Sequence, residues 1–190
     1  CIRDSASAAA ELCGERPDPQ WSAVAAGLRI PHFADGTTRE HAGYDGEMIK
    51  QADANLLGYP LGIVTGREAQ LRDLEYYERR IDPRNGPAMS YSVFAIQYAR
   101  LGMAEKACEM FRRSYLPNLR PPFGVFAETA TSGNPYFMTG AGGMLQAVLF
   151  GFGGLEITAD GLVQRPSVLP PQWKNLRIKI NGKIYQATNQ

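Results

Sequence analysis

The sequence predicts a mainly α-helical protein that ends in antiparallel β-strands. Up to about residue 150, apolar residues recur every three to four positions, which is the spacing of one helix face. From residue 153 on, apolar and polar residues alternate instead, most clearly over 176–180. The dipeptide Asn181-Gly182 follows this run and is the strongest short signal for a two-residue hairpin turn. We therefore expect a helical part over 1–152 and a strand region over 153–190.

Two short helices are expected first. An Ala-rich helix over 5–13 should end at Gly14, because glycine readily adopts the left-handed backbone that closes a helix. Asp18 and Pro19 should open the second helix, since Asp caps free N–H groups and Pro fits the first helical turn.

Further helix signals continue along the chain. We expect helices near 50–58 and over 68–81, 87–102, 104–115 and 138–150. Gly102 alone connects two of them, so these two should be antiparallel neighbours. Pro117, Pro121 and Pro122 predict irregular backbone. The last helix is apolar on nearly all sides and should be deeply buried. Its glycines favour close helix packing over a phosphate-binding loop.

Composition excludes several classes of function. The formal net charge is +1, without the basic surplus of a nucleic-acid-binding protein. The longest apolar stretches fall short of the roughly 20 residues that a membrane helix needs. The cysteines Cys1, Cys13 and Cys108 and the histidines His32 and His41 lack zinc-ligand spacing. We expect no cofactor, no metal, no nucleic acid and no membrane partner, and the sequence leaves the compartment open.

Two segments carry polar groups that packing does not explain. Lys50 and Gln51 lie at the expected start of an otherwise apolar helix, where ammonium and amide donors suit sugar hydroxyls. A solvated helix start, with Asp53 near the positive end of the dipole, is the alternative. Glu128 is the only acid between Glu109 and Glu156 and precedes the most apolar helix. A carboxylate against an apolar wall suits proton transfer, whereas an ordinary surface loop is the alternative.

Several segments together resemble glycoside hydrolase family 65, and their order and spacing extend over nearly the whole chain. They are Ile49-Lys50-Gln51-Ala52-Asp53, Leu56-Leu57-Gly58-Tyr59-Pro60, Gly86-Pro87-Ala88-Met89-Ser90, Phe137-Met138-Thr139-Gly140-Ala141-Gly142-Gly143-Met144-Leu145-Gln146 and Val148-Leu149-Phe150-Gly151-Phe152-Gly153-Gly154-Leu155. The resemblance is strongest to the branch that holds the protein-glucosylgalactosylhydroxylysine glucosidases and the acid trehalases.

This resemblance implies that 1–152 forms the second half of an (α/α)6 barrel and that 153–190 begins a C-terminal antiparallel β-domain. It implies that Lys50 and Gln51 grip the non-reducing glucosyl unit of an α-linked glucoside. It gives Glu128 the role of general base in an inverting hydrolysis. The family's general acid lies upstream of residue 1, so an N-terminal chain or segment should complete the barrel.

Two other functions stay open. In the family's phosphorylases, the loop around Glu128 carries hydroxyl groups and a histidine that bind phosphate. No histidine lies within 120–146, which favours water, although Thr129, Thr131 and Ser132 keep a disaccharide phosphorylase possible. A non-catalytic sugar-binding or scaffolding chain is the other alternative. The resemblance leaves trehalose, kojibiose and the collagen disaccharide as candidate substrates.

Overall fold

The computed structural model of the chain describes residues 2–189. These residues form two compact units, one that ends at Tyr44 and one that begins at Asp45. Among the described helices, none combines the length and the apolar character that crossing a membrane requires.

The first unit contains two helices whose ends confirm the expected boundary signals. They are α1 (Ile2–Leu12) and α2 (Pro19–Gly27). Past the end of α1, Gly14 has a φ of 74°, and the N–H of Glu15 donates to the carbonyl of Ala10 at 2.8 Å. The Asp18 side chain accepts the backbone N–H of Gln20 at 2.9 Å and so caps α2. A left-handed glycine and a capping aspartate therefore define these helices, as the sequence predicts.

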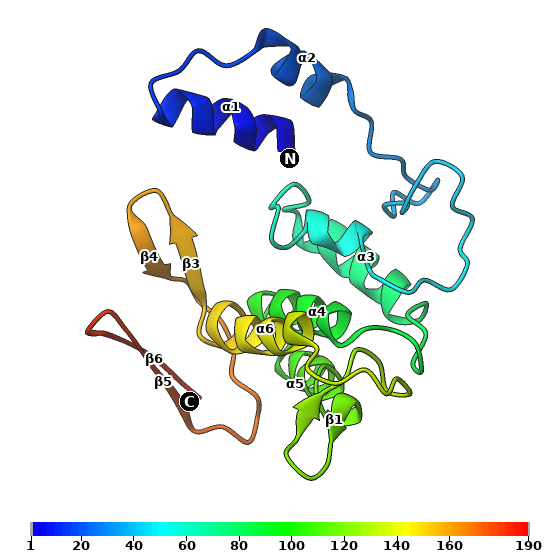
Figure 1. Ribbon diagram of the computed structural model, residues 1–190, viewed down its shortest axis with the longest axis vertical. Coiled ribbons are helices and arrows are strands. Elements are labelled where there is room, and N and C mark those ends of the chain that lie inside the picture. The colour runs from blue at the N-terminus through cyan, green and yellow to red at the C-terminus, as the bar shows by residue number, and fades with distance from the viewer. Residues whose placement is uncertain (1, 190) are drawn as a thin grey trace. The chain divides into compact units, whose positions relative to one another are not determined.

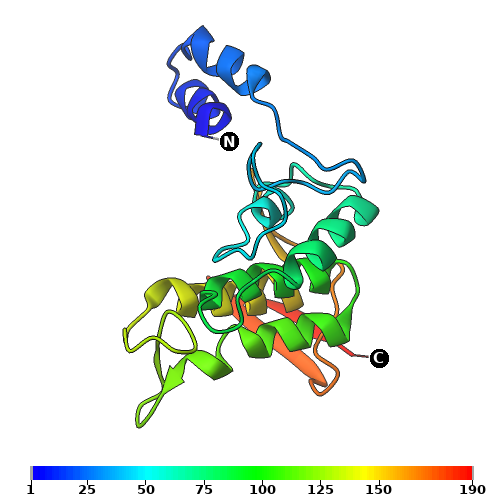
Figure 2. The same cartoon turned by 90° about the vertical axis from the view of Figure 1, so that its right-hand side faces the viewer.

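The second unit is built around one buried helix. Its α-helices are α3 (Arg67–Glu78), α4 (Ala88–Arg100), α5 (Ala104–Arg113) and α6 (Met138–Gln146). In α4, the side chains of Phe94, Ile96 and Tyr98 are fully buried. α5 and α6 both pack along α4 (Figure 1, Figure 2). The turn between α4 and α5 uses Gly102 with a φ of 78°, which agrees with the expected antiparallel pair.

Glycines let α6 approach α4 closely. After Gln146 the helix continues as a short π-helical segment, η3 (Ala147–Phe152). A Cβ atom added at Gly143 would lie 3.0 Å from the Ser92 hydroxyl, and one at Gly151 would lie 3.2 Å from the Ile96 Cα. Larger residues at these positions would push the helices apart, which confirms the packing role for Gly143, whereas a Cβ atom at Gly142 would meet nothing within 4 Å.

The expected deep burial of 138–150 is wrong. The buried residues are Gly140 in α6 and Ala147, Gly151 and Phe152 in η3. Met138 and Leu145 are 76% and 56% exposed. The apolar composition of this segment signals burial on all sides, but the described residues cover only part of it, mainly the side toward α4 and, in η3, also the side toward the strand region.

The strand region forms two hairpins. Its strands are β3 (Leu155–Thr158), β4 (Gly161–Gln164), β5 (Asn175–Ile180) and β6 (Lys183–Thr188), paired antiparallel as β3–β4 and β5–β6. Asn181 and Gly182 have φ values of 48° and 81°, as the predicted two-residue turn requires. Leu155, Ile178 and Tyr185 form a buried cluster against which η3 also packs. The division of the chain at residue 153 stays a prediction.

Short elements connect the helices and shape the region around Glu128. They are η1 (Ala54–Leu57), η2 (Leu116–Asn118), β1 (Leu119–Arg120) and β2 (Val125–Phe126). The proline-rich segment is therefore more regular than expected, because β1 and β2 pair antiparallel with Arg120 opposite Val125. This pairing places the end of η2 beside the residues that follow β2.

Candidate active site

The structure brings together two of the three residues that the sequence singles out. The Lys50 ammonium nitrogen lies 3.1 Å from the Oε1 atom of Glu128. The Lys50 side chain is 60% exposed and that of Glu128 is 29% exposed. The carboxylate is therefore partly sheltered but open to a small molecule. Gln51 is exposed beside Lys50, but its side chain takes no part in the ion pair between Lys50 and Glu128.

The expected helix start at Lys50 is wrong. Ile49 forms an isolated parallel bridge with Ile81, in which the Ile49 N–H donates to the Arg80 carbonyl at 2.8 Å. Extended backbone at Ile49 is incompatible with helix there, and the short helix η1 begins only at Ala54. Ile49 and Ala52 are buried on either side of Lys50 and Gln51. These anchors direct the two polar side chains toward solvent.

The backbone of Glu128 is fixed from two directions. Its carbonyl accepts the N–H of Ala88, the first residue of α4, at 3.1 Å. It also accepts the side-chain amide of Asn118 at 2.9 Å, and the same amide donates to the Ala127 carbonyl at 3.0 Å. Asn118 is only 3% exposed. A buried amide and the start of the central helix therefore hold the residue that carries the carboxylate.

Arg120 holds the loop that follows Glu128. Its two terminal guanidinium nitrogens donate to the backbone carbonyls of Pro117 (2.8 Å), Leu119 (3.2 Å), Thr129 (3.0 Å), Ala130 (2.8 Å) and Ser132 (3.1 Å). The two terminal nitrogens carry four N–H groups, so at least one N–H is shared between two carbonyls, and the planar guanidinium holds these donors in fixed directions that suit such a convergence.

A tight connection between α3 and α4 links the Lys50 segment to the Glu128 loop. The Asp82 carboxylate accepts the N–H groups of Arg84 (2.8 Å) and Asn85 (3.2 Å) and the Asn85 amide (2.9 Å). These hydrogen bonds lower the pKa of Asp82 below its usual value, and the one from the Arg84 N–H has the largest effect. Across from it, the Thr131 hydroxyl lies 3.3 Å from the Arg84 carbonyl. The connection therefore contacts both segments of the site.

Each of the three hydroxyl groups of the loop has a partner, two of them within the loop and that of Thr131 in the connection between α3 and α4. The Thr129 hydroxyl accepts the N–H of Ser132 at 3.0 Å, and the Ser132 hydroxyl accepts the N–H of Asn134 at 3.2 Å. Thr129 is also buried. These contacts, with that of Thr131, give each hydroxyl a role in shaping the loop.

Asn118 and Arg120 are functional candidates that the sequence reasoning missed. Their only signal is a pair of polar residues two positions apart in a proline-bounded segment shortly before Glu128. Asn118 ends η2 and Arg120 lies in β1, and both side chains reach the loop that follows β2. Among the residues whose side chains the structure describes, no group of three or more His, Cys, Asp or Glu has the geometry of a metal site.

Comparison with known proteins identifies relatives over most of the chain. No family model matches. A kojibiose hydrolase of Mucilaginibacter mallensis is 49% identical over 91% of this chain. A protein-glucosylgalactosylhydroxylysine glucosidase of Danio rerio is 39% identical over 88%, and a periplasmic/secreted acid trehalase of Candida glabrata is 36% identical over 77%. The chain belongs to glycoside hydrolase family 65.

The family 65 chain matches only part of these relatives. It spans about a quarter of the kojibiose hydrolase and of the glucosidase (26% each), and 13% of the trehalase. Among solved structures, a human-microbiome protein assigned as a kojibiose phosphorylase has a TM-score of 0.50 and 22% identity. That likeness covers 73% of this chain and 20% of the other, and it supports the mainly helical fold alone.

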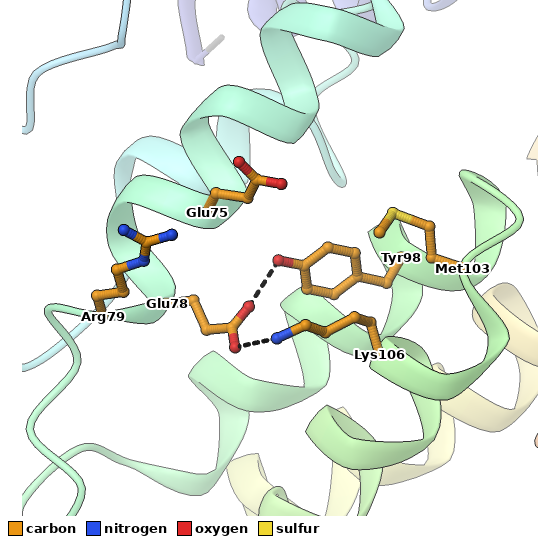
Figure 3. Close-up of a pocket in the computed structure, with 6 residues that line it drawn as sticks. All are labelled: Glu75, Glu78, Arg79, Tyr98, Met103 and Lys106. Carbon is orange, nitrogen blue, oxygen red and sulfur yellow. Dashed lines mark hydrogen bonds and ion pairs between the residues drawn. The ribbon is translucent and has the colours of Figure 1, made fainter.

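A second cluster of charged residues in the family 65 chain lies away from the Lys50–Glu128 pair. Glu78 lies at the end of α3, and its carboxylate accepts the Tyr98 hydroxyl and the Lys106 ammonium, each at 2.7 Å (Figure 3). Together with Glu75, Arg79 and Met103, these residues line a cavity of about 150 Å³. Because the contacts join α3, α4 and α5, we interpret the cluster as structural.

The protonation of this cluster follows from its contacts. Burial raises the pKa of Glu78, but the hydrogen bonds from Lys106 and Tyr98 outweigh it, and the pKa lies below its usual value. The hydrogen bond to Glu78 raises the pKa of Lys106. A carboxyl group with a lowered folded-state pKa stabilises the fold above its unfolded pKa, about 4.3, and this stabilisation is lost as the pH falls through the folded-state value.

We expect Glu78→Gln to lower the free energy of unfolding by about 1–2 kcal/mol at pH 7, because a charged hydrogen-bond acceptor is lost. The difference from the wild type should shrink at acid pH, as the pH falls from about 4.3 through the lower folded-state pKa of Glu78 and the wild-type carboxyl takes up its proton. Urea unfolding of the full natural chain at both pH values measures this. Glu75→Gln, at an exposed position of the same helix, should change the free energy by less than about 0.5 kcal/mol. A difference for Glu78→Gln that is the same at both pH values would contradict the assigned charge.

Proposed function

We propose that this chain forms part of the catalytic (α/α)6 barrel of an enzyme that hydrolyses α-linked glucosides with inversion of configuration. Glu128 acts as the general base that deprotonates the attacking water. Lys50 and Gln51 hold the glucosyl unit. The observation that carries the proposal is the 3.1 Å contact between Lys50 and Glu128, which joins the expected sugar-binding residue to the expected base.

The geometry around Glu128 suits this role. Its carboxylate is 29% exposed, so a water molecule can reach it, while the backbone on both sides is hydrogen-bonded to buried groups. A general base works when it is held within hydrogen-bond reach of the proton that it removes. Lys50 fixes one carboxylate oxygen and leaves the other to accept a proton. Its exposed ammonium group can also donate to sugar hydroxyls.

An inverting hydrolysis needs a second carboxyl group. In such enzymes a general acid lies roughly 6.5–9.5 Å from the base, with the attacking water between them. We assign this acid to a segment outside the present chain, in the part of the relatives that the chain does not span. The same part completes the barrel. The complete protein would bind an α-glucoside as its substrate.

Water is favoured over phosphate as the nucleophile. Phosphate would approach the Glu128 carboxylate as an anion, and like charges repel. The Arg120 guanidinium, which contacts the loop after Glu128, has both terminal nitrogens occupied by backbone carbonyls. The hydroxyl groups of Thr129, Thr131 and Ser132 also have partners within or beside the loop.

A substrate panel tests this function in the full natural chain. We expect glucose release from at least one of kojibiose, trehalose and glucosylgalactosylhydroxylysine, at the same rate with and without inorganic phosphate. NMR spectra of the first turnovers should show β-glucose, because inversion at an α-linked carbon gives the β anomer. Formation of glucose 1-phosphate, with cleavage that depends on added phosphate, would show that the enzyme is a phosphorylase and not a hydrolase. Binding of these sugars without any cleavage would favour a non-catalytic chain.

A further inference from the structure

Asn118 and Arg120 together hold an unbroken run of backbone carbonyls around Glu128. The Asn118 amide donates to the carbonyls of Ala127 and Glu128. The Arg120 guanidinium donates to the carbonyls of Thr129, Ala130 and Ser132. The backbone carbonyls of residues 127 to 130 therefore all accept a hydrogen bond from the side chain of Asn118 or of Arg120, and these two residues lie two positions apart in the sequence.

This arrangement fixes the direction of the Glu128 side chain. Neighbouring carbonyls of extended backbone point to opposite sides, so a run that converges on one pair of donors curves the loop. The carbonyls lie on the inside of that curve, while the Glu128 carboxylate reaches Lys50 in a different segment. Asn118 is buried and Arg120 is partly buried, so solvent competes little for these hydrogen bonds.

The remaining contacts of these two residues tie the loop to a rigid support. The Ala127 N–H donates to the Asn118 carbonyl at 2.8 Å, and Arg120 pairs with Val125 across the β1–β2 hairpin. Arg120 also donates to the Pro117 carbonyl on η2. The loop that carries Glu128 is thus attached to the hairpin and to the end of α5 through η2, rather than held by its own short-range contacts alone.

We propose that Asn118 and Arg120 are positioning residues for Glu128. They contact neither substrate nor the reacting atoms, and they act by holding the carboxylate at the distance and angle that water activation needs. This inference rests on the proposed function of Glu128. A misplacement of about 1 Å in such a group can lower the rate about a hundredfold, even when substrate binding is intact.

Arg120→Ala and Arg120→Lys in the full natural chain test the proposal. We expect Arg120→Ala to lower kcat by about 10- to 100-fold with KM changed less than about threefold. Arg120→Lys, which keeps the charge but loses the planar set of donors, should fall between the wild type and Arg120→Ala. Arg165→Ala, which removes a surface arginine paired with Glu156, is the matched control and should leave kcat unchanged.

A double-mutant cycle separates positioning from a general structural effect. If Arg120 acts through Glu128, adding Arg120→Ala to Glu128→Gln should lower kcat by less than about twofold. The same 10- to 100-fold loss in both backgrounds would overturn the proposal, as would Arg120→Lys with wild-type kcat. If Arg120→Ala does not fold, the same cycle is measured with Asn118→Ala and with Arg120→Lys, each alone and combined with Glu128→Gln, and the same criteria apply to them. Full activity of Glu128→Gln alone would instead show that the proposed function of Glu128 has failed.

Discussion

Glu128→Gln is expected to lower kcat by about two to four orders of magnitude, the usual contribution of a positioned proton acceptor. The glutamine keeps the size of the side chain and can still contact Lys50, but it cannot take a proton from water. KM should change little, because Lys50 and Gln51 remain to hold the glucosyl unit. Steady-state kinetics of the full natural chain on its best disaccharide substrate would measure both constants.

Glu156→Gln is the matched control for this change. Glu156 is also a partly exposed carboxylate that pairs with a cation, Arg165 at 2.7 Å, but it lies in β3 within the strand region. Its loss should leave kcat within about twofold of the wild type, since exposed ion pairs contribute little. A kcat for Glu128→Gln above about a third of the wild-type value, far outside the range for a general base, would remove Glu128 from that role.

Lys50→Met should lower kcat/KM by about one to two orders of magnitude. A hydrogen bond to a charged group contributes about 1.5–3 kcal/mol, and each 1.4 kcal/mol corresponds to a factor of ten. We expect both constants to change, because Lys50 is proposed to bind the sugar and is also the partner of Glu128 at 3.1 Å. Methionine keeps most of the length of the side chain, so the loss reports on the ammonium group.

Lys179→Met, at an exposed position of β5, serves as the control for the loss of one positive charge. It should leave kcat/KM unchanged. If Lys50→Met also leaves KM and kcat within about twofold of the wild type, far below the expected loss of a charged contact, Lys50 does not bind the substrate. The ion pair with Glu128 would then be an ordinary surface contact.

Helix ends and hairpin turns were predictable from the sequence because their signals are local. Gly14 and Asn181-Gly182 adopt positive φ values that few other residues tolerate, so the residue type determines the backbone. Asp18 and Pro19 likewise define the start of α2 without help from distant residues. In each case the physical cause lies within a few positions of the residue that reveals it.

The errors have causes that lie far away in the sequence. Lys50 looked like a helix start because the residues after it are apolar, but the bridge between Ile49 and Ile81 holds the backbone extended. The burial of 138–150 depends on which faces other segments cover, and composition does not determine that. Asn118 and Arg120 were missed because their acceptors are backbone carbonyls, which every residue carries and no sequence pattern distinguishes.

Chemical rescue of Glu128→Ala by azide tests the role of Glu128 most directly. Azide is a small nucleophile that needs no general base, so it can occupy the space of the lost side chain and attack the sugar in place of water. We expect azide to restore turnover of the full natural chain and NMR to identify the product as β-glucosyl azide, the inverted anomer. A folded Glu128→Ala variant that azide does not reactivate, or that forms the α anomer, would contradict Glu128 as the base of an inverting hydrolysis.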